Sequence, residues 1–376
     1  MVWQNKVVKI TAIINKVVTP IILDALKKSG LQDINMTTGR MMILEEQRGI
    51  WAALSPEEAL ASMPADVLSF LVSSELEEGV LNLIVEKGRL DEPGRGSVFS
   101  EDVNLLKTHA LCQENRVGNF EQGEARTQVN LMGICCIIQR GEGDVLSRVV
   151  LDTGTCVPAV TFGEGTGLRD KLGLLRITIP AEKGIINVVA SAYDAESVMD
   201  MMIDVGKLDQ VGKGFIYMYP VKRGVIDKKI NYGMARHVAS IEQIISAVDN
   251  LMDSVAWRRR GGVLGDGNMS QENRAYLTDL LDVTLICDEG RGEDLVREAM
   301  DAGAAGATLS KQKHFSLNAV QAGHISPARE TCSMIVGEAQ VEQILDAIEA
   351  AGAFDDHTHG QVLARSVPKA CTYLGK

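Results

Sequence analysis

The sequence is poor in several residue types that particular classes of protein require. Aromatic residues make up 4% of its 376 residues and histidine occurs six times, so the cores are expected to consist of Val, Ile, Leu, Met and Ala. There are 38 Lys and Arg against 50 Asp and Glu, which gives a net charge of −12. An acidic surface of this size repels phosphate backbones and anionic lipid, so binding to nucleic acid or to a membrane surface is not expected.

Long uncharged apolar runs are also missing. Lys9 and Lys16 interrupt the apolar stretch 7–23, whereas a membrane span needs about 20 apolar residues, and a secretory signal has no such charges in its apolar region. The cysteines are odd in number, and Cys135 and Cys136 are neighbours in an expected strand, where they would face opposite sides. Reduced thiols fit best, so a soluble cytoplasmic protein without membrane insertion is expected.

One pattern occurs three times along the chain. The length corresponds to two to four domains of about 100–200 residues each. In each copy a short apolar run ends in a polar residue, and a glycine follows fifteen residues later. The pairs are Asn15 and Gly30, Gln139 and Gly154, and Asp288 and Gly303. Equal spacing at three places indicates an internal repeat.

The residues between each polar residue and its glycine have the periodicity of a helix. Apolar residues stand seven and eleven positions after the polar residue, so they share one helix face that can pack on a sheet. They are Ile22 and Leu26, Leu146 and Val150, and Leu295 and Ala299. The glycine suits the left-handed conformation that ends a helix. Each repeat therefore begins with a strand, a helix and a stop.

Two strands and a second helix follow each of these glycines. Apolar runs predict second strands near 34–37, 157–161 and 307–310, and third strands at 68–72, 185–189 and 332–336. Polar stretches between them are predicted to be loops, at about 39–66, 163–183 and 312–328. The second helices are predicted to end on Gly88, Gly206 and Gly352, and a fourth strand follows each of them after a turn.

This order of elements predicts an α+β fold of three tandem ferredoxin-like (βαββαβ) domains. The expected boundaries are 1–105 for the first repeat, 128–231 for the second and 280–376 for the third. Residues 101–129 are predicted to be a loop or an added edge strand. Residues 232–279 are predicted to be a helical linker whose apolar stripe packs against its own protein.

The turns before the fourth strands are the best candidate sites. Glycines stand eight residues apart in each: Gly88 and Gly96, Gly206 and Gly214, and Gly352 and Gly360. A glycine-rich turn ahead of a strand exposes backbone N–H groups that can converge on a phosphate oxygen. The two candidate phosphate sites are Gly94, Arg95, Gly96 and Ser97, and Gly212, Lys213, Gly214 and Phe215. In the alternative, these glycines serve only the geometry of a tight turn.

The second repeat carries a resemblance to a known family. Gly206-Lys207-Leu208 leads into residues 212–221, and this text, with the order of elements and the long loop between the second and third strands, resembles the PII (nitrogen regulatory protein P-II) signalling proteins. Gly165 and Gly167 stand where PII proteins carry a Gly-x-Gly at the base of the T-loop. Thr308, within the stretch 306–310, is similar to a threonine of the family's Gly-x-Thr-x-Thr second strand.

The resemblance implies a function. PII proteins are homotrimers that bind ATP or ADP in the clefts between neighbouring subunits, so three fused units would form a covalent pseudo-trimer, monomeric as a chain, with adenine nucleotide between its repeats. The fusion would cover the edge strands of each unit without an entropic cost of association. The implied role is signal transduction in nitrogen or carbon metabolism, in which the T-loops contact a protein partner such as a transporter or a metabolic enzyme. Enzymatic activity is not implied.

Several positions depart from the family pattern. The lysine that follows the second loop glycine in PII proteins is replaced by Ser97, Phe215 and Gln361. Of the two arginines that clamp the phosphates in the family, one has a counterpart in Lys228. The glutamine that helps to hold 2-oxoglutarate with Mg²⁺ is replaced by Glu45, Arg169 and Asn318, so sensing of 2-oxoglutarate is not expected. Trp51 in the first loop either anchors a partner or packs on its own protein.

Parts of the sequence fit two other functions. A metal-binding or scaffolding trimer mimic is the main alternative, because His357 and His359 would share one side of an extended strand near Asp355 and Asp356. A solvated polar turn is the favoured interpretation there, so no metal ligand is predicted. An enzyme with a site between domains is the third alternative. The stretch 206–213 misses the Walker spacing, and no catalytic Ser-His-Asp or Cys-His set is recognisable.

Overall fold

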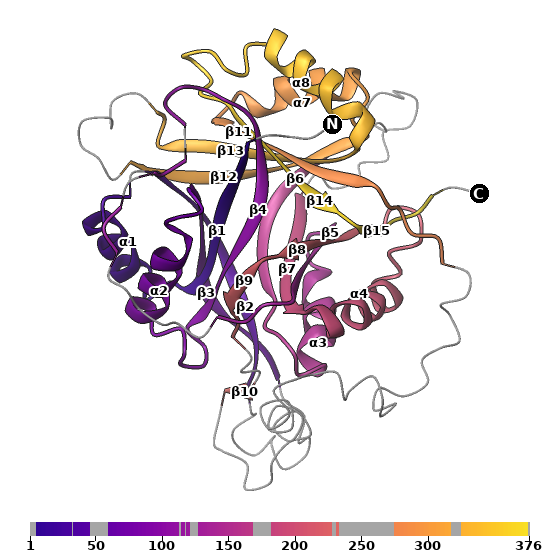
Figure 1. Ribbon diagram of the computed structural model, residues 1–376. Helices are drawn as coiled ribbons and strands as arrows, with labels where there is room; N and C mark the ends of the chain where they lie inside the picture. Colours follow the sequence, from indigo (N-terminus) through magenta and orange to yellow (C-terminus); the bar gives the residue numbers. More distant parts are fainter. Residues whose placement is uncertain are drawn as a thin grey trace, which may run out of the picture.

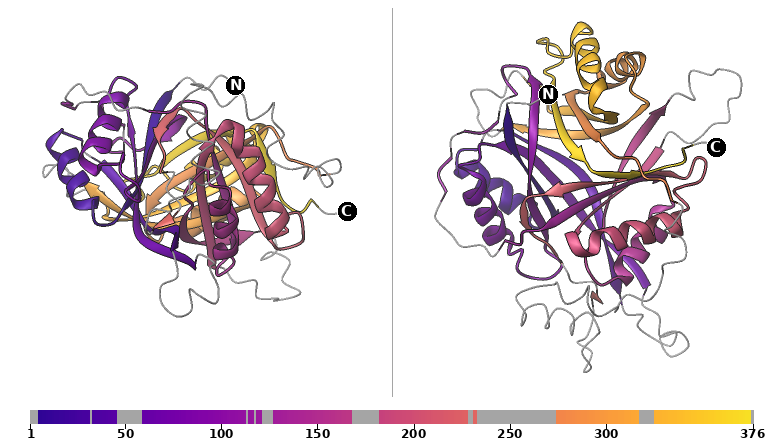
Figure 2. Two further views of the ribbon diagram at one scale, coloured as in Figure 1. Left: turned by 90° about the horizontal axis from the view of Figure 1, so that it is seen from below. Right: turned by 45° about the vertical axis from the view of Figure 1, so that its right-hand side comes forward.

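The computed structural model is mixed α/β, with six helices and one large, mainly antiparallel sheet among the residues that it describes (Figure 1). These residues are 5–31, 33–45, 59–112, 114–116, 118–120, 127–167, 182–227, 231–232, 274–316 and 325–374. Three pairs of helices lie at the periphery, and the strands fill the space between them (Figures 1 and 2).

The first six elements show how the sheet is built. They are β1 (Lys6–Asn15), α1 (Thr19–Lys28), β2 (Asp33–Glu45), β3 (Ala59–Val72), α2 (Glu77–Gly88) and β4 (Gly96–Thr108). β1 pairs with β3 on one side and β4 on the other, and β2 pairs with β3, all antiparallel. Pro20 lies in the first turn of α1, where its missing N–H is not needed. We refer to these elements as the first unit.

The same order and pairing occur twice more. The second unit contains β5 (Leu131–Gln139), α3 (Gly143–Asp152), β6 (Ala159–Gly167), β7 (Glu182–Ser191), α4 (Ala192–Gly206) and β8 (Gly214–Val221). The third contains β11 (Leu280–Asp288), α7 (Gly292–Asp301), β12 (Gly306–Ser316), β13 (Ala328–Gly337), a short 3-10 turn η4 (Glu338–Gln340), α8 (Val341–Ala350) and β14 (Gln361–Val367). Their strand orders are β6-β7-β5-β8 and β12-β13-β11-β14, which match β2-β3-β1-β4.

The predicted helix faces and stops of the first helices are confirmed. All six apolar residues named for those helices are buried, and each lies in the core between its own helices and strands. Gly30, Gly154 and Gly303 have φ of +90°, +72° and +113°. Cys135 and Cys136 are both buried, in different core clusters, so they face opposite sides of β5 as expected.

One local prediction was wrong. The stretch 39–66, predicted as a loop, is largely strand, because β2 continues to Glu45 and β3 begins at Ala59. Here Met41, Met42, Ile43 and Leu44 are all buried, so both faces of this strand are covered. The stretch 101–129, predicted to be a loop or an added edge strand, begins as the continuation of β4 to Thr108, and the end of this strand pairs with β14.

Two of the three second helices end on the predicted glycine, whereas the third ends at Ala350, before Gly352. Gly88 and Gly206 are the last helical residues, and the left-handed conformation falls on Arg89 and Lys207, with φ of 50° and 51°. Only Gly352 carries the positive φ itself, at 82°. By its conformation Gly352 therefore corresponds to Arg89 and Lys207, and not to Gly88 and Gly206 as the spacing of eight residues suggested.

The three units close on one another in a cycle. The end of β4 pairs with β14 of the third unit, β9 (Arg223–Val225) pairs with β4 of the first, and β15 (Lys369–Cys371) pairs with β8 of the second. In addition β2, β6 and β12 pair with one another two by two. Each unit thus donates the continuation of its last strand to another unit, and the three second strands meet at one junction.

Equivalent positions at the centre carry different residues. Counted from strand register, Glu101, Tyr219 and Arg365 occupy the same place in β4, β8 and β14. The Arg365 guanidinium lies 2.5 Å from a Glu101 oxygen and 3.7 Å from the centre of the Tyr219 ring. It also reaches Asp282 of its own unit, at 2.9 Å. One side chain of the third unit therefore joins all three units.

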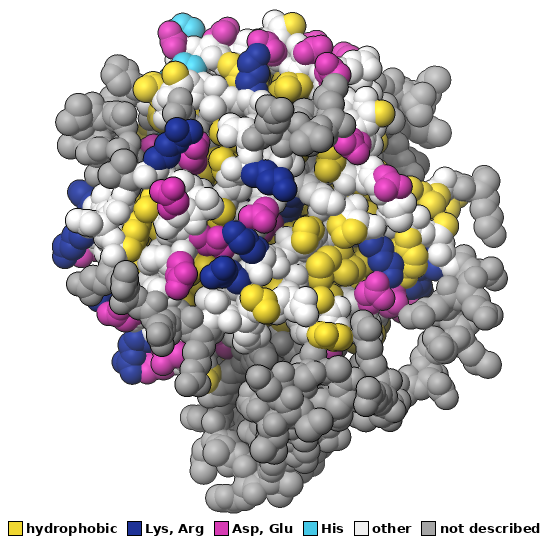
Figure 3. All heavy atoms as spheres, viewed as in Figure 1, with side chains coloured by type: hydrophobic (Ala, Val, Ile, Leu, Met, Phe, Trp, Pro, Cys, Tyr) yellow, Lys and Arg dark blue, Asp and Glu magenta, His cyan; other side chains and the backbone are white. Residues whose placement is uncertain are grey.

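Other predictions concern residues that the structure does not describe. The predicted linker helix lies mainly within 233–273, outside the described residues, and of its surroundings only β10 (Asn231–Tyr232) is described, paired with β2. No helix in the described part is long and apolar enough to cross a membrane. On the face shown in Figure 3, acidic and basic side chains are interspersed, and no broad basic patch is visible.

Candidate functional site

The first turn already holds an anion, supplied by the chain itself. Gly94 and Gly96 have φ of +77° and +125°, and a Cβ on Gly96 would lie 2.1 Å from the carbonyl oxygen of Ile13. The Gly94 N–H donates to the Asp227 carboxylate at 2.7 Å, and the Asp227 N–H donates to Ser97 Oγ at 2.8 Å. Asp227 is 5% exposed. The turn therefore binds a carboxylate oxygen in the way that was expected for phosphate.

Arg95 does not take part in this contact. Its Nε lies 3.2 Å from a Glu92 carboxylate oxygen, and both side chains are one-third exposed. The backbone carbonyl of Arg95 accepts from the Asn15 N–H. The guanidinium is thus neutralised within its own turn.

The second turn has the same backbone shape and different surroundings. Gly212 and Gly214 have φ of +73° and +148°, and a Cβ on Gly214 would lie 2.5 Å from a backbone carbonyl oxygen. Lys213 Nζ lies 3.4 Å from Glu142, and both side chains are 41% exposed. The Thr372 hydroxyl donates to the Gly214 carbonyl at 3.0 Å. Among the described residues, nothing accepts a hydrogen bond from the Gly212 N–H.

Strand register identifies the residue that replaces Asp227 at the second turn. Val225 pairs with Val98, two residues after Gly96, and Cys371 pairs with Ile216, two residues after Gly214. Counting two residues further along each donated strand gives Asp227 in one case and Tyr373 in the other. Tyr373 is 42% exposed and carries no charge. The second turn therefore lacks the internal carboxylate.

A cavity of about 760 Å³ lies beside the second turn, at the junction of β2, β6 and β12. This volume is within the usual range of small-molecule sites, roughly 300–1,000 Å³. Its charged and aromatic lining includes Arg140, Phe162, Glu182, Lys183, Lys311 and Lys313.

Two contacts define the part of the cavity wall nearest the turn. Arg140 pairs with Glu182 at 2.9 Å and lies over the Phe162 ring, 5.1 Å from its centre. Burial lowers the pKa of Lys183, and the charge of Glu142 acts in the opposite direction. Because Glu142 also pairs with Lys213, the cavity wall and the second turn are neighbours.

The residues named from the PII resemblance lie together in one strand pair. Gly165 is opposite Thr308 and Gly167 is opposite Gly306, where β6 meets β12. A Cβ on Gly165 would lie 2.6 Å from Cε of Lys183, so the glycine gives that side chain room to cross the strand. They border the cavity without lining it. Lys228 lies outside the described residues.

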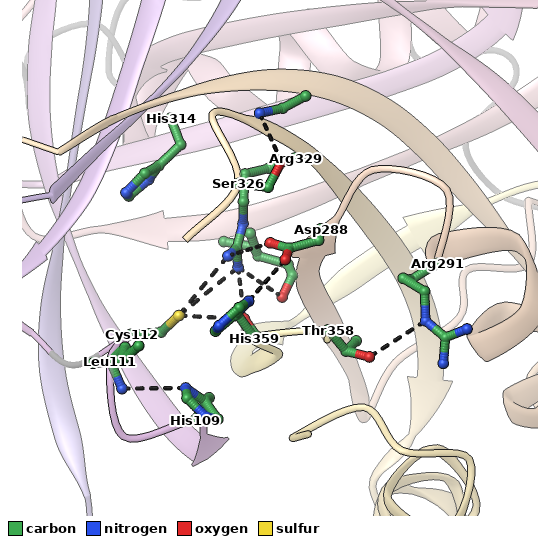
Figure 4. A network of polar contacts seen from close by, with 12 residues as sticks. His109, Leu111, Cys112, Asp288, Arg291, His314, Ser326, Arg329, Thr358 and His359 are labelled. Atoms are coloured by element: carbon green, nitrogen blue, oxygen red, sulfur yellow. Dashed lines mark hydrogen bonds and ion pairs between the residues drawn. The ribbon is translucent and has the colours of Figure 1, made fainter. Parts of the chain in front are cut away.

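The third turn is closed by a buried polar network (Figure 4). His359 Nδ1 lies within hydrogen-bond distance of an Asp288 carboxylate oxygen, at 2.7 Å. The Arg329 guanidinium forms an ion pair with the other Asp288 oxygen, at 3.0 Å. Arg329 also donates to the His359 carbonyl at 2.8 Å, and the Cys112 thiol contacts the same carbonyl at 3.2 Å. Burial raises the pKa of Cys112. The cavity beside these residues is only about 40 Å³, enough for about three water molecules.

Residues 355–358 form the turn that was favoured over an extended strand, but this turn is only partly exposed to solvent. His359 has a φ of +47° and is 6% exposed, whereas His357 is exposed, so they do not share one side of a strand. The N–H groups of Thr358 and His359 both donate to the Asp355 carbonyl, which curls the chain into a turn. Within the described ranges, no three His, Cys, Asp or Glu side chains form a group that could hold a metal ion.

The loops that would contact a partner are not described. Trp51, Arg169 and Asn318 fall in the stretches 46–58, 168–181 and 317–324, outside the described residues. Glu45, at the end of β2, is exposed. The predictions made for these loops therefore stay predictions.

Sequence reasoning named Asp288 only as the polar end of a strand, and it missed Asp227 and Arg329, which decide whether a turn is open. No motif contains them, and each acts on a turn that is distant in sequence. The one usable signal was the alignment of the repeats, which places Arg329 and Lys183 at equivalent positions. No family model matches the chain, and no curated protein matches it significantly.

Proposed function

We propose that the chain is a PII-like regulator, built of three ferredoxin-like repeats as a pseudo-trimer, that binds ATP or ADP at the second turn. The recurring element order, the matching strand orders and the cyclic strand exchange support the architecture. In this proposal the protein acts in the cytoplasm as a regulator rather than as an enzyme.

One observation carries the ligand part of the proposal. The Gly94 N–H holds a carboxylate oxygen at 2.7 Å, so a turn of this shape binds an anionic oxygen. The second turn repeats the shape with Gly212 and Gly214 and has no internal anion among the described residues. Lys213 adds a half-exposed positive charge beside it, and the partner of this charge is Glu142, 3.4 Å away on another element. A phosphate group fits this combination of N–H donor and ammonium group.

The cavity beside the turn supports a ligand larger than phosphate. Phe162 is 41% exposed and lines this cavity, so its ring offers a surface for an aromatic base. Lys183 and Arg140 lie on the same wall and would face the negative charge of the phosphates. The contact of the T-loops with a protein partner, in nitrogen or carbon metabolism, is proposed from the family resemblance.

Titration calorimetry with ADP, ATP and pyrophosphate tests the proposal. Lys213→Ala is expected to weaken binding about tenfold or more, because a hydrogen bond to a charged group is worth roughly 1.5–3 kcal/mol. Arg95→Ala is the matched control, since Arg95 holds the same place in the closed first turn and is paired with Glu92. It should leave the affinity unchanged. No binding by the unmodified chain would favour the scaffolding alternative, and equal losses in both variants would remove the second turn from the proposal.

A further inference from the structure

The first and second turns differ in what the neighbouring unit brings to them. In the first, the donated strand β9 ends beside Asp227, whose carboxylate accepts from Gly94. In the second, the donated strand β15 ends beside Tyr373, which is exposed. The backbone that would receive an anion has the same positive φ at both places. The difference therefore lies in one residue of each donated strand.

Asp227 is held in place by more than one contact. Its N–H donates to Ser97 Oγ, while the residue at the place of Ser97 in the second turn is Phe215, which has no acceptor. The strand before Asp227 is paired with β4, from Val98 to Ser100. A carboxylate tethered in this way competes with any free anion at a high effective concentration.

The third turn is filled by side chains of its own unit. The N–H groups of Thr358 and His359 donate to Asp355, and the Gly360 N–H donates to Ala353 at 2.8 Å. Arg329 and Asp288 fill the adjoining space. Of the first two turns, whose glycines share one backbone shape, only the second leaves the N–H of its first glycine without an acceptor among the described residues.

We propose that Asp227 is a built-in ligand that closes the first turn, so that the chain binds one phosphate-bearing ligand instead of three. A phosphate oxygen needs the Gly94 N–H that the carboxylate already occupies, and two anions at one donor repel each other. Asp227 is thus a residue that determines which cleft binds. The count of one ligand rests on the proposed function of the second turn, whereas the closure of the first turn does not.

Removing the carboxylate at 227 and creating one at 373 tests the proposal. The number of pyrophosphate molecules bound per chain is measured by calorimetry. The unmodified chain is expected to bind one pyrophosphate, Asp227→Ala two, and the double variant Phe215→Ser/Tyr373→Asp none. Combining all three substitutions should restore one site, now at the first turn. A stoichiometry of one in Asp227→Ala would overturn the closure of the first turn.

A second measurement needs no ligand. Pro93-Gly94 is the only Pro-Gly pair in the sequence, so labelling proline with ¹³C and glycine with ¹⁵N gives a single carbonyl-selected NMR signal, that of the Gly94 amide. Asp227→Ala should move this signal strongly, and Asp227→Asn, which retains a hydrogen-bond acceptor without the charge, should move it less. An unchanged signal in Asp227→Ala would overturn the proposal.

The two proposals fail in different ways. If the unmodified chain binds no pyrophosphate but Asp227→Ala binds one, the second turn is not the ligand site and the closure by Asp227 stands. If the unmodified chain binds one and Asp227→Ala still binds one with an unmoved Gly94 signal, the proposed function stands and the closure by Asp227 is wrong. Asp227→Asn serves as the folded reference, because it keeps the size of the buried side chain.

Discussion

The second and third units share one strand register, yet they place their charges differently. Lys183 pairs in register with Gln139 in the second, and Arg329 pairs in the same way with Asp288 in the third. Arg329 is 3% exposed and bonded to its neighbours, while Lys183 is half-buried and lines an open cavity. The comparison teaches that the same backbone arrangement allows either a buried ion pair or an open cleft. The choice depends on the residues at two paired positions, Gln139 and Lys183 or Asp288 and Arg329.

The same contrast occurs at the centre of the molecule. Asp282 and Arg365 face each other in the third unit, whereas Gly133 and Tyr219 hold these places in the second. A Cβ on Gly133 would lie 2.1 Å from the Tyr219 ring, so the ring needs the glycine. In a homotrimer one residue would meet its own copies at such a centre. A fused chain instead brings an arginine against a tyrosine ring and the Glu101 carboxylate.

The largest effect is expected from breaking the central contact. Arg365→Ala would remove the guanidinium between Asp282 and Glu101, both 1% exposed, and leave Glu101 with the more distant Lys9, at 3.6 Å. Loss of one member of a buried ion pair costs about 3–5 kcal/mol, so we expect a loss of stability at the upper end of that range. Urea denaturation measures it. The matched variant in the second unit, Tyr219→Phe, keeps the ring and should cost far less; equal losses would contradict the comparison.

The next effect separates the two clefts directly. Among the described residues, Arg329→Ala leaves the largely buried Asp288 with His359 as its remaining side-chain partner, and we expect it to cost about 3 kcal/mol of the free energy of unfolding. Lys183→Ala, at the equivalent place, should cost less than about 1 kcal/mol, because a half-buried lysine retains water. Thermal and urea unfolding of both variants decide the matter. A Lys183 variant as unstable as the Arg329 variant would show that Lys183, too, stabilises the fold, and the comparison would fail.

Much of the fold could be predicted from the sequence because it depends on local spacing. Gly30, Gly154 and Gly303 end helices by a conformation that needs only the glycine itself. The first two turns were found for the same reason, since Gly94 and Gly212 mark them in the sequence. Positive φ at Arg89 and Lys207 was not foreseen, because no glycine marks it.

The state of each cleft could not be predicted in this way. Asp227 reaches Gly94 only after β9 has crossed to another unit, and Arg329 meets His359 only after the turn has curled inward. Such contacts depend on how the units close and not on the distance along the chain. The length of β2 was missed for a related reason, since its far half is buried partly by other units through its pairing with β6.

The smallest effect is expected from lowering the pH, which protonates Asp282 at the centre of the molecule without any substitution. Burial alone would raise the pKa of Asp282, but the charge of Arg365 and hydrogen bonds from Arg365 and Ser333 outweigh it, so the pKa lies below its usual value. A carboxyl group with a lowered folded pKa contributes stability above its unfolded pKa, near 3.9, and loses that contribution as the pH falls through the folded value. We therefore expect stability to decline below about pH 4, and less than in Arg365→Ala, because a protonated Asp282 keeps its place among its partners. Unfolding free energies at several pH values measure the decline.

Two variants serve as controls for this measurement. Asp282→Asn should reduce the slope of unfolding free energy against pH below about pH 4, whereas Lys183→Ala should leave it unchanged. The same slope in all three proteins would assign the acid sensitivity to carboxylates away from the centre.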